Sequence, residues 1–422
     1  MAAPETKSQG WMSASESADP YDVAISGGGL VGVTLALALA RAGVRSAVME
    51  AHAPGAAAPA PRPIALAEGS RRILESLGLW EEIAEHATAI RVIHISDRGR
   101  FGFARLKCED FQIDAFGYVT DAEKLAEVLE RSLAAAEEIA LFRPYAARQI
   151  EAHEDLRRVF GAPVNAATDG ITLDAKLVVA ADGGQSAARA LSGIGARRRD
   201  WDQSAITATV ETRLGHDNVA YERFTTEGPI ALLPMDRRCC GLVWTLPHGD
   251  ADTLMGLDDK RFLESLREHF GSRLGAFVKT GPRTRHRLHS IRSASAVKPR
   301  LALVGNAANH LHPVAGQGLN LGLRDAAVLA EVVVEAIRNG EDPGAMATLR
   351  RYADWRRRDH WSTTRFTEGV VRLFSNDFAP LVAVRDLGLI GLDSFGYLKK
   401  VLARHAMGLA GRSPRLARGL PL

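Results

Sequence analysis

Three glycines near the N-terminus have the spacing of a turn that binds phosphate. Gly27, Gly29 and Gly32 follow the apolar run 23–25 and precede residues 30–41, which have the composition of a packed helix. In a dinucleotide-binding fold the first glycine allows a sharp exit from a strand, the second lets the backbone approach a pyrophosphate, and the third lets the helix lie close to the sheet. The N–H groups and the dipole at the start of such a helix favour anions. The spacing therefore predicts a site for the pyrophosphate of a dinucleotide.

An acidic residue lies at the matching distance beyond these glycines. A second apolar run, 46–49, ends at Glu50, where such a fold places an acid that hydrogen-bonds a ribose, about 20 residues past the turn. An acid favours a free 2′-hydroxyl, as in FAD or NAD, over a 2′-phosphate. The alternative is a glycine-rich turn that binds nothing, and the order of strand, turn, helix, strand and acid argues against it.

Two later segments also have a buried strand that leads into a polar turn. Strand 171–180 precedes Asp182 and Gly183, and strand 301–304 precedes Asn306. After the second of these turns a glycine-rich loop leads into a helix, whose first N–H groups would face an electron-rich group. An ordinary glycine-rich loop is the alternative for this segment. The loop contains Pro313, Gly316 and Gly318, and the helix runs through residues 329–336.

Length and composition indicate a globular protein with a large core. The chain has 422 residues and a net charge of +3, so no strongly charged partner is indicated. Nucleic acid is excluded as a partner because no basic tract carries interleaved aromatic residues. Three cysteines, two of them adjacent, indicate a reducing compartment, here the cytoplasm, without a disulfide framework or a zinc site. No run of eighteen apolar residues predicts a membrane span.

The pattern of the chain predicts an α/β fold with mixed α+β character. We expect a Rossmann-like dinucleotide-binding domain, into which a sheet-rich substrate domain is inserted in two pieces. Alternating residues 91–96 and the turn at 97–99 indicate a strand and a hairpin, and residues 205–248 alternate again. The expected divisions are a disordered tail at 1–20, a dinucleotide-binding domain at 21–90, 119–190 and 290–340, a substrate-binding sheet domain at 91–118 and 191–289, and a C-terminal helical segment at 341–422.

Together the three motifs resemble those of the single-component flavoprotein aromatic hydroxylases, over roughly residues 20–415. Within that family the chain is similar to the ubiquinone-biosynthesis branch, which includes the 2-polyprenyl-6-methoxyphenol hydroxylases. The residues that carry this second resemblance are Gly305-Asn306, Leu311-His312-Pro313, Glu222-Arg223-Phe224-Thr225, the run 228–234 and the C-terminal end 418–422. The resemblance implies a fold like that of para-hydroxybenzoate hydroxylase.

The resemblance also implies the roles of individual residues. FAD would be the cofactor, and NAD(P)H the electron donor. Arg62, at the end of an irregular proline-rich stretch, would approach the phosphates or the active site, or would be an ordinary surface arginine. The other implied cofactor contacts are Gly27, Gly29 and Gly32 with the pyrophosphate, Glu50 with the adenosine ribose, Asp182-Gly183 with FAD and the nicotinamide route, Asn306 with the ribityl chain, Pro313 beside the isoalloxazine, and Gly318, Leu319 and Asn320 at its pyrimidine carbonyl.

The implied reaction is the hydroxylation of a polyprenylated phenol in ubiquinone biosynthesis, through a flavin hydroperoxide formed with O₂. The cofactor carries this chemistry, and the protein binds, positions and excludes water. His312 or His310 would act as the base for the phenol, with Pro313 beside the reacting centre, and a structural histidine is the alternative for each. His289, His310 and His312 lack the spacing of a metal site. Departures from the family are Asn309-His310, Arg287-Leu288-His289 and the absence of an arginine near position 123, so flavin contacts there are open.

Other functions remain open from the sequence alone. The chain could hydroxylate a soluble aromatic compound, reduce isoprenoid double bonds, or hold FAD as a non-catalytic assembly subunit. The ring carbon, the choice between NADH and NADPH, the substrate-contacting side chains and the oligomeric state, including a homo-oligomer, are not determined.

The C-terminal region has two interpretations. Apolar residues recur at near-helical spacing over 378–402, basic residues follow, and no acid occurs after Asp393. Such a stretch fits peripheral contact with an anionic membrane, such as a bacterial inner membrane, and with other quinone-biosynthesis enzymes. A helix pair that closes the substrate domain is the alternative. The basic run Arg356-Arg357-Arg358, on a preceding helix, is expected to be a solvated face.

Overall fold

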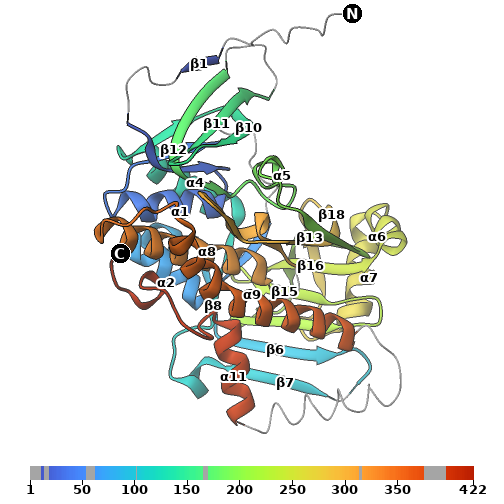
Figure 1. Ribbon diagram of the computed structural model, residues 1–422. Coiled ribbons are helices and arrows are strands. Elements are labelled where there is room, and N and C mark those ends of the chain that lie inside the picture. The colour runs from blue at the N-terminus through green and yellow to red at the C-terminus, as the bar shows by residue number, and fades with distance from the viewer. Residues whose placement is uncertain are drawn as a thin grey trace, which may run out of the picture.

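The computed structural model describes residues 11–13, 19–53, 62–100, 102–164, 170–312, 316–374 and 396–422. Figure 1 shows two large sheets, one near the N-terminal strands and one at the opposite side of the molecule, with the long helices between them. The tail expected at 1–20 lies largely outside the described residues. Pro313 and most of the apolar stretch 378–402 lie outside them as well.

The first sheet carries the dinucleotide-binding pattern. Its order is β10-β11-β12-β2-β3-β9, with β20 beside β12, and β12, β2, β3, β9 and β20 are parallel. Parallel strands buried on both faces read as continuous apolar runs, which is why they are visible in the sequence. The bounds are β2 Tyr21–Ser26, β3 Ser46–Met49, β9 Ile139–Phe142, β10 Tyr145–Ala152, β11 Arg157–Pro163, β12 Gly170–Ala180, β20 Leu301–Leu303, and at the margins β1 Trp11–Ser13 and β19 Val297–Lys298.

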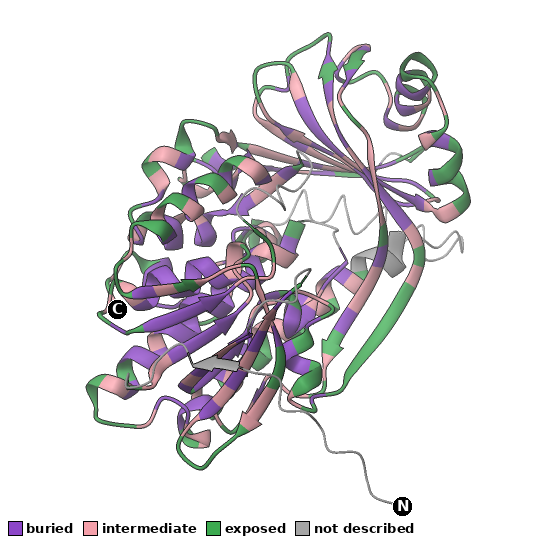
Figure 2. Ribbon diagram, turned by 90° about the horizontal axis from the view of Figure 1, so that it is seen from above, coloured by how far each residue is buried: buried purple, intermediate pink, exposed green. Residues whose placement is uncertain are grey.

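Helices α1, α4 and α8 pack beside this sheet. Helix α1, Leu30–Ala40, is buried on nearly all sides because it also contacts α8, Gln317–Arg338, and α4, Ala122–Ala134. This burial explains why the sequence of α1 is apolar without an amphipathic pattern. The dense core around α1 and α8 is visible as the buried helices in Figure 2.

The second sheet has the order β21-β18-β13-β16-β15-β14-β6-β7, with β17 beside β13. Strands from residues 92–107 complete a sheet that is otherwise built from residues 196–310, through the parallel pairing of β6 with β14. Helices α6 and α7 cover its outer face, where Trp244 packs on Phe262. The bounds are β6 Val92–Asp97, β7 Phe103–Lys107, β13 Ala196–Thr212, β14 Val219–Phe224, β15 Ile230–Pro234, β16 Cys239–Pro247, β17 Phe277–Thr280, β18 Thr284–Ser293, β21 Asn309–His310, α6 His248–Met255 and α7 Asp259–Phe270.

A small sheet and the C-terminal helices complete the fold. The small sheet has the order β4-β8-β5, and α9 packs along α8. None of the described helices combines the length and the apolar character that a membrane crossing requires. The remaining bounds are β4 Pro63–Ala67, β5 Thr88–Ile90, β8 Gly117–Asp121, α2 Glu68–Ser76, α3 Trp80–Ala84, α5 Ala187–Leu191, α9 Met346–Phe374, α11 Gly396–Ala406, and the short 3-10 turns Cys108–Phe111, Gly305–Ala307 and Leu416–Arg418.

The mixed α/β fold and the strands that carry the three motifs are confirmed. Two of the expected division points fall inside strands, since 118/119 lies in β8 and 289/290 lies in β18. The loop expected to contain Gly318 is shorter than predicted, since α8 already begins at Gln317. The alternation of apolar and polar residues predicted strands over 205–248 but did not reveal the helices α6 and α7, which pack on the second sheet.

Candidate active site

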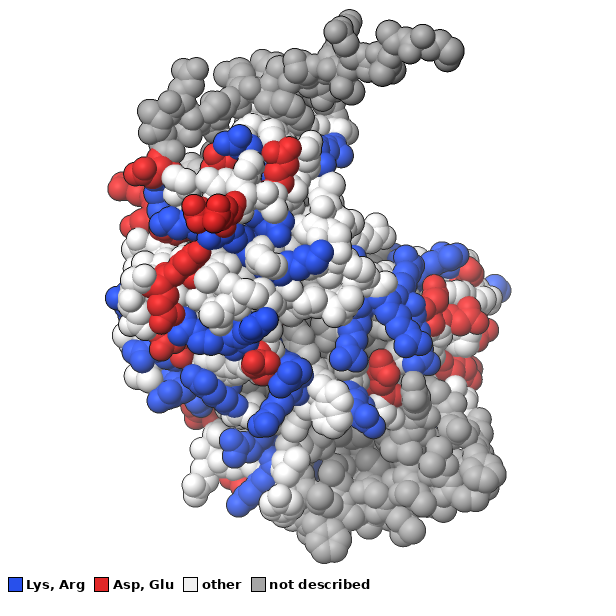
Figure 3. Space-filling view, viewed as in Figure 1, with Lys and Arg blue, Asp and Glu red and all other residues white. Residues whose placement is uncertain are grey.

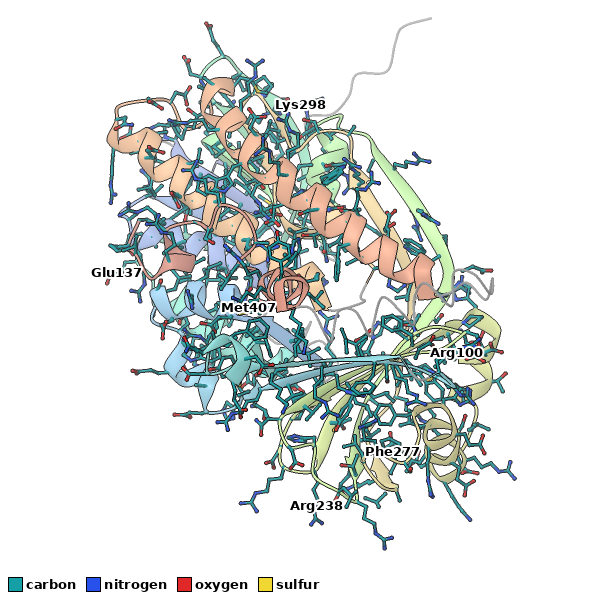
Figure 4. The ribbon with its side chains drawn as sticks, turned by 90° about the horizontal axis from the view of Figure 1, so that it is seen from below. Arg100, Glu137, Arg238, Phe277, Lys298 and Met407 are labelled. Carbon is teal, nitrogen blue, oxygen red and sulfur yellow. The ribbon has the colours of Figure 1, made fainter. Side chains whose placement is uncertain are left out.

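A large cavity lies where the two sheets, the small sheet and the C-terminal helices meet. Its volume is about 2030 Å³, whereas a site for one drug-sized ligand is typically about 300–1000 Å³. Met407, just after α11, lies near the middle of the molecule, between the part that carries Lys298 and Glu137 and the part that carries Arg238 and Phe277 (Figure 4). The cavity has room for a dinucleotide and a second ligand.

The glycine turn between β2 and α1 forms one wall of this cavity. Gly27 has a φ of +110°, and a Cβ there would lie 2.6 Å from the carbonyl carbon of Ala181. A Cβ on Gly32 would lie 2.0 Å from the carbonyl oxygen of Gly27, so the close packing of helix on turn requires glycine. Gly29, the N-cap of α1, lines the cavity, and a Cβ there would meet no protein atom within 4 Å. Gly27 and Gly32 thus shape the turn, while Gly29 leaves room for a ligand.

Glu50, at the end of β3, is fixed beside this turn. Its carboxylate accepts hydrogen bonds from the backbone N–H of Gly28, at 2.6 Å, and from that of His52, at 2.9 Å. Burial opposes its charge, but the hydrogen bonds from His52 and Gly28 outweigh burial, so the pKa of Glu50 lies below its ordinary value. Glu50 and Arg62 both line the cavity, and burial lowers the pKa of Arg62.

The turn after β12 is joined to the third motif. Asp182 accepts hydrogen bonds from Ser186 Oγ and, at 2.9 Å, from the N–H of Ala188. Burial raises its pKa although these bonds lower it. Arg189 then donates to the carbonyl oxygen of Ala307, at 2.9 Å. Asp182 and Gly183 therefore line the cavity on a turn that is fixed to the segment after β20.

The third motif also lines the cavity. Asn306 follows Gly305, which has a φ of +58°, and Gly316, with a φ of +60°, caps the start of α8. Gly318, Leu319 and Asn320 are in its first turn, and all three line the cavity together with Asn306.

The side chain of Asn320 has a structural role that the sequence did not indicate. Its amide oxygen accepts from the N–H of Ala67 and from Ser70 Oγ, and its NH₂ donates to the carbonyl oxygens of Ala65 and Gly316, each at 2.8 Å. These bonds hold the start of α8 against β4 and α2.

The histidines occupy different positions. His312 is 2% exposed, packs edge-on against Trp201 with ring centroids 5.3 Å apart, and is not among the residues that line the cavity. His310 does line the cavity, and its ring lies against that of His289, with centroids 4.8 Å apart and the planes tilted by 44°. Burial lowers the pKa of His312 to about 4, and burial with the charges of His289 and Arg198 lowers that of His310 to about 4. The prediction that His312 is the base therefore does not fit its position, and both histidines would be weak bases.

The described residues contain no group of three or more His, Cys, Asp or Glu side chains placed to hold a metal. Of the predicted cofactor residues that the structure describes, only Gly32 is absent from the cavity wall, and it packs against the carbonyl oxygen of Gly27 in the turn. Pro313 lies outside the described residues.

The inner face of the second sheet forms an apolar floor for the cavity. Its small and aliphatic side chains come from β6, β13, β15 and β16, and one acid, Glu222 of β14, lies among them. The sequence marked residues 222–225 as a family motif without assigning Glu222 a role. The sequence did contain a sign of this role. Glu222 lies two residues from Ala220 and from Phe224, both buried, so on a strand its carboxylate is on the same core-facing side. The other floor residues are Ile93, Ile95, Ala205, Thr207, Ala231, Leu233, Val243 and Thr245.

Comparisons with known proteins agree with this geometry. A family model described as an FAD binding domain matches residues 20–367. The chain belongs to this family. It is 40% identical to the ubiquinone hydroxylase UbiL of Rhodospirillum rubrum, over 95% of this chain and 93% of that protein. It is 30% identical to the 3-demethoxyubiquinol 3-hydroxylase of Escherichia coli, over 92% of this chain and 99% of that protein.

A solved structure shows the same fold. The p-nitrophenol 4-monooxygenase PnpA of Pseudomonas putida matches with a TM-score of 0.76 and 19% identity, over 93% of this chain and 99% of its own. The predicted placement among the FAD-dependent aromatic hydroxylases of the ubiquinone-biosynthesis branch is confirmed, and the protein is an FAD-dependent monooxygenase.

FAD is the cofactor of this protein, and the residues that line the cavity are suited to bind it. The glycine turn is too close for a side chain at Gly27 and Gly32 but open at Gly29, as a pyrophosphate site requires. When bound, FAD supplies the reduction and the O₂ chemistry of the reaction.

Proposed function

We propose that this protein hydroxylates the aromatic ring of a polyprenylated phenol in ubiquinone biosynthesis, with NAD(P)H as reductant and O₂ as the oxygen source. The observation that carries the proposal is the apolar floor of a cavity whose other wall is built for FAD. An alkyl-rich surface with a single acid suits a hydrophobic phenol better than a charged, soluble aromatic acid.

Within this proposal the residues have distinct roles. Gly29 and the N–H groups at the start of α1 hold the pyrophosphate, Glu50 the ribose, and Asn306 with the first turn of α8 the flavin end. The second sheet positions the phenol and excludes water from its ring. Water exclusion matters because it protects reactive intermediates from wasteful side reactions.

Helix α11 connects the cavity with the outer surface. Leu402 and Ala406 on one side of it line the cavity, together with Phe366 of α9. Tyr397, 78% exposed, and Val401, 42% exposed, point outward.

The outward side of α11 also carries positive charge. Lys400 and Arg404 are exposed, and they fall with Tyr397 and Val401 at helical spacings of three and four residues. Lys and Arg side chains outnumber acids around this helix in Figure 3. An aromatic, aliphatic and cationic face of this kind fits the surface of an anionic membrane. We propose peripheral attachment there, with the polyprenyl tail reaching the cavity beside α11.

The test begins with lipid extracts of cells that lack this protein, analysed by mass spectrometry. We expect a prenylated phenol that lacks one ring oxygen to accumulate, and its structure names the carbon that is hydroxylated. Normal ubiquinone without such a precursor would contradict the proposal. A Glu211→Gln variant, changed at an exposed position of β13, is the matched control and should restore ubiquinone.

The purified FAD-loaded protein separates the remaining functions. Hydroxylation predicts NAD(P)H-dependent O₂ uptake that is stimulated by a prenylated phenol and yields a product heavier by one oxygen. Stimulation by a soluble phenol alone would favour a soluble substrate. NAD(P)H oxidation without O₂ uptake, with saturation of the prenyl chain, would indicate a reductase, and no turnover would indicate an assembly subunit.

A further inference from the structure

Glu222 lies in the middle of the apolar cavity floor. It is on β14, opposite Ile95 of β6 and Ala231 of β15. The same row continues across the sheet through Val243 to Thr207. Its carboxylate is thus surrounded by alkyl groups on the face where the second ligand must lie.

This carboxylate has no protein partner among the residues that the structure describes. Neither a hydrogen bond nor an ion pair of Glu222 is present, and burial alone raises its pKa to about 7. The side chain is half-buried and lines the open cavity. An unpaired carboxylate in such a place is costly, and a partner that arrives with the ligand would offset the cost.

We propose that Glu222 is the acceptor for the phenolic O–H of the substrate and takes its proton as the ring is attacked. This inference rests on the proposed function. The O–H bond of the phenol breaks, a new O–H bond forms on a carboxylate oxygen of Glu222, and the electron pair stays on the phenol oxygen. The electron-rich ring that results is the form that accepts an electrophilic oxygen.

Few other ionisable groups share this part of the cavity. β15 carries none, and β6 carries His94 on its other face, beside Tyr221, and Asp97, which lies beside Phe224 and does not line the cavity. Across the floor, His286 of β18 contacts Thr207 Oγ1 at 3.2 Å. Arg62 and Arg285 lie elsewhere along the wall, and the facing residues of α9 and α11 are Phe366, Leu402 and Ala406. None of these groups shifts the pKa of Glu222.

The pKa of Glu222 suits a base that takes a proton from the substrate. A group with a pKa near neutrality accepts a proton efficiently at physiological pH, whereas a group with a pKa of about 4 is a weak acceptor. Glu222 has the first property, while His310 and His312 have the second.

The experiment measures binding of 2-prenylphenol and of its methyl ether to the FAD-loaded protein, by the change in flavin absorbance. Measurements at about pH 6 and about pH 8.5 lie on either side of the pKa of Glu222. We expect the wild type to bind the phenol about tenfold more tightly at the higher pH, because a carboxylate accepts a stronger hydrogen bond than a carboxylic acid. The ether, which has no O–H, should show no such change.

Substitution at Glu222 should remove this pH dependence. We expect Glu222→Gln to bind the phenol about tenfold more weakly than wild type at the higher pH and to bind the ether equally well. The low-pH limb of kcat should also disappear, while FAD retention stays unchanged. Glu211→Gln should behave as wild type.

Two outcomes overturn the inference in different ways. Wild-type affinity and wild-type pH dependence in Glu222→Gln would exclude Glu222 as the acceptor and leave the proposed function intact. If the wild type itself binds neither the phenol nor the ether, the proposed function fails and the inference fails with it. Loss of FAD or of thermal stability in Glu222→Gln would indicate a structural role and also contradict the inference.

Discussion

Asp325 of α8 is completely buried, and we expect its replacement by asparagine to be strongly destabilising. Its carboxylate accepts three hydrogen bonds, from Arg356 Nε at 2.6 Å, His360 Nε2 at 2.7 Å and the N–H of Gly305 at 3.0 Å. Arg356 of α9 is 2% exposed. Breaking a buried ion pair by removing one partner typically costs about 3–5 kcal/mol. Because Arg356 keeps a second carboxylate, that of Asp359, we expect Asp325→Asn to cost about 3 kcal/mol.

The pH dependence of this effect has a definite sign. Burial raises the pKa of Asp325, but His360 and Arg356 outweigh burial, and the folded pKa lies below the ordinary value of 3.8. The stabilisation is therefore present above the unfolded pKa and is lost as the pH falls through the folded pKa. The difference between wild type and Asp325→Asn should be constant near neutral pH and shrink well below pH 3.8.

Urea denaturation followed by circular dichroism measures the difference in the free energy of unfolding. The matched control is Asp354→Asn on α9, which breaks an exposed pair with Arg357 at 3.3 Å and should cost less than about 0.5 kcal/mol. The Asp325 variant should also retain less FAD, because the turn at Gly305 loses an acceptor beside Asn306. Equal stability of Asp325→Asn and Asp354→Asn would refute the reasoning.

Two further predictions concern the cofactor turn and the cavity floor. Gly29→Val should fold but lose FAD, because a Cβ at this position meets no protein atom within 4 Å and the side chain extends into the space for the cofactor. Gly32→Ala should lose both FAD and thermal stability, because its Cβ would clash with the carbonyl oxygen of Gly27. A purified Gly29→Val protein that stays fully yellow would contradict the site. Because burial raises the pKa of Glu222 from 4.5 to about 7, the folded state holds this proton more tightly and wild-type stability should fall as the pH rises between these values. Substrate-free Glu222→Gln should then exceed wild type above about pH 7 by up to about 3 kcal/mol and match it near pH 4 in urea titrations; parallel pH profiles would count against the burial of this carboxyl.

The cofactor half of the site could be predicted because its signals are local. Gly27, Gly29, Gly32 and Glu50 belong to one strand-turn-helix-strand unit, and the identity of each residue follows from contacts within that unit or with the next strand. The mixed α/β fold followed from the same kind of evidence, since buried parallel strands are apolar along their whole length.

The remainder depends on contacts between distant segments. Arg356 was expected on a solvated face, but it is buried and forms an ion pair with Asp325 of α8, a different helix. The cavity floor is assembled from β6 and β13–β16, so the environment of Glu222 is not visible in its neighbours along the chain. His312 packs against Trp201 and is not among the residues that line the cavity, and the sequence reveals neither fact.

The pairing of β6 with β14 has a consequence for how the chain acquires its structure. Val92 lies beside Val219, so this part of the second sheet stays incomplete until both segments, and the FAD-binding segment between them, have been synthesised. Contacts between distant segments slow folding, because the entropy cost of closing a long loop comes before the strands gain stabilising contacts. During that interval the edge of β14 is an unprotected template for other strands. Expression of the second sheet alone, from residue 191 onward, should therefore give an aggregating fragment, and co-synthesis of the 92–107 hairpin should reduce that aggregation.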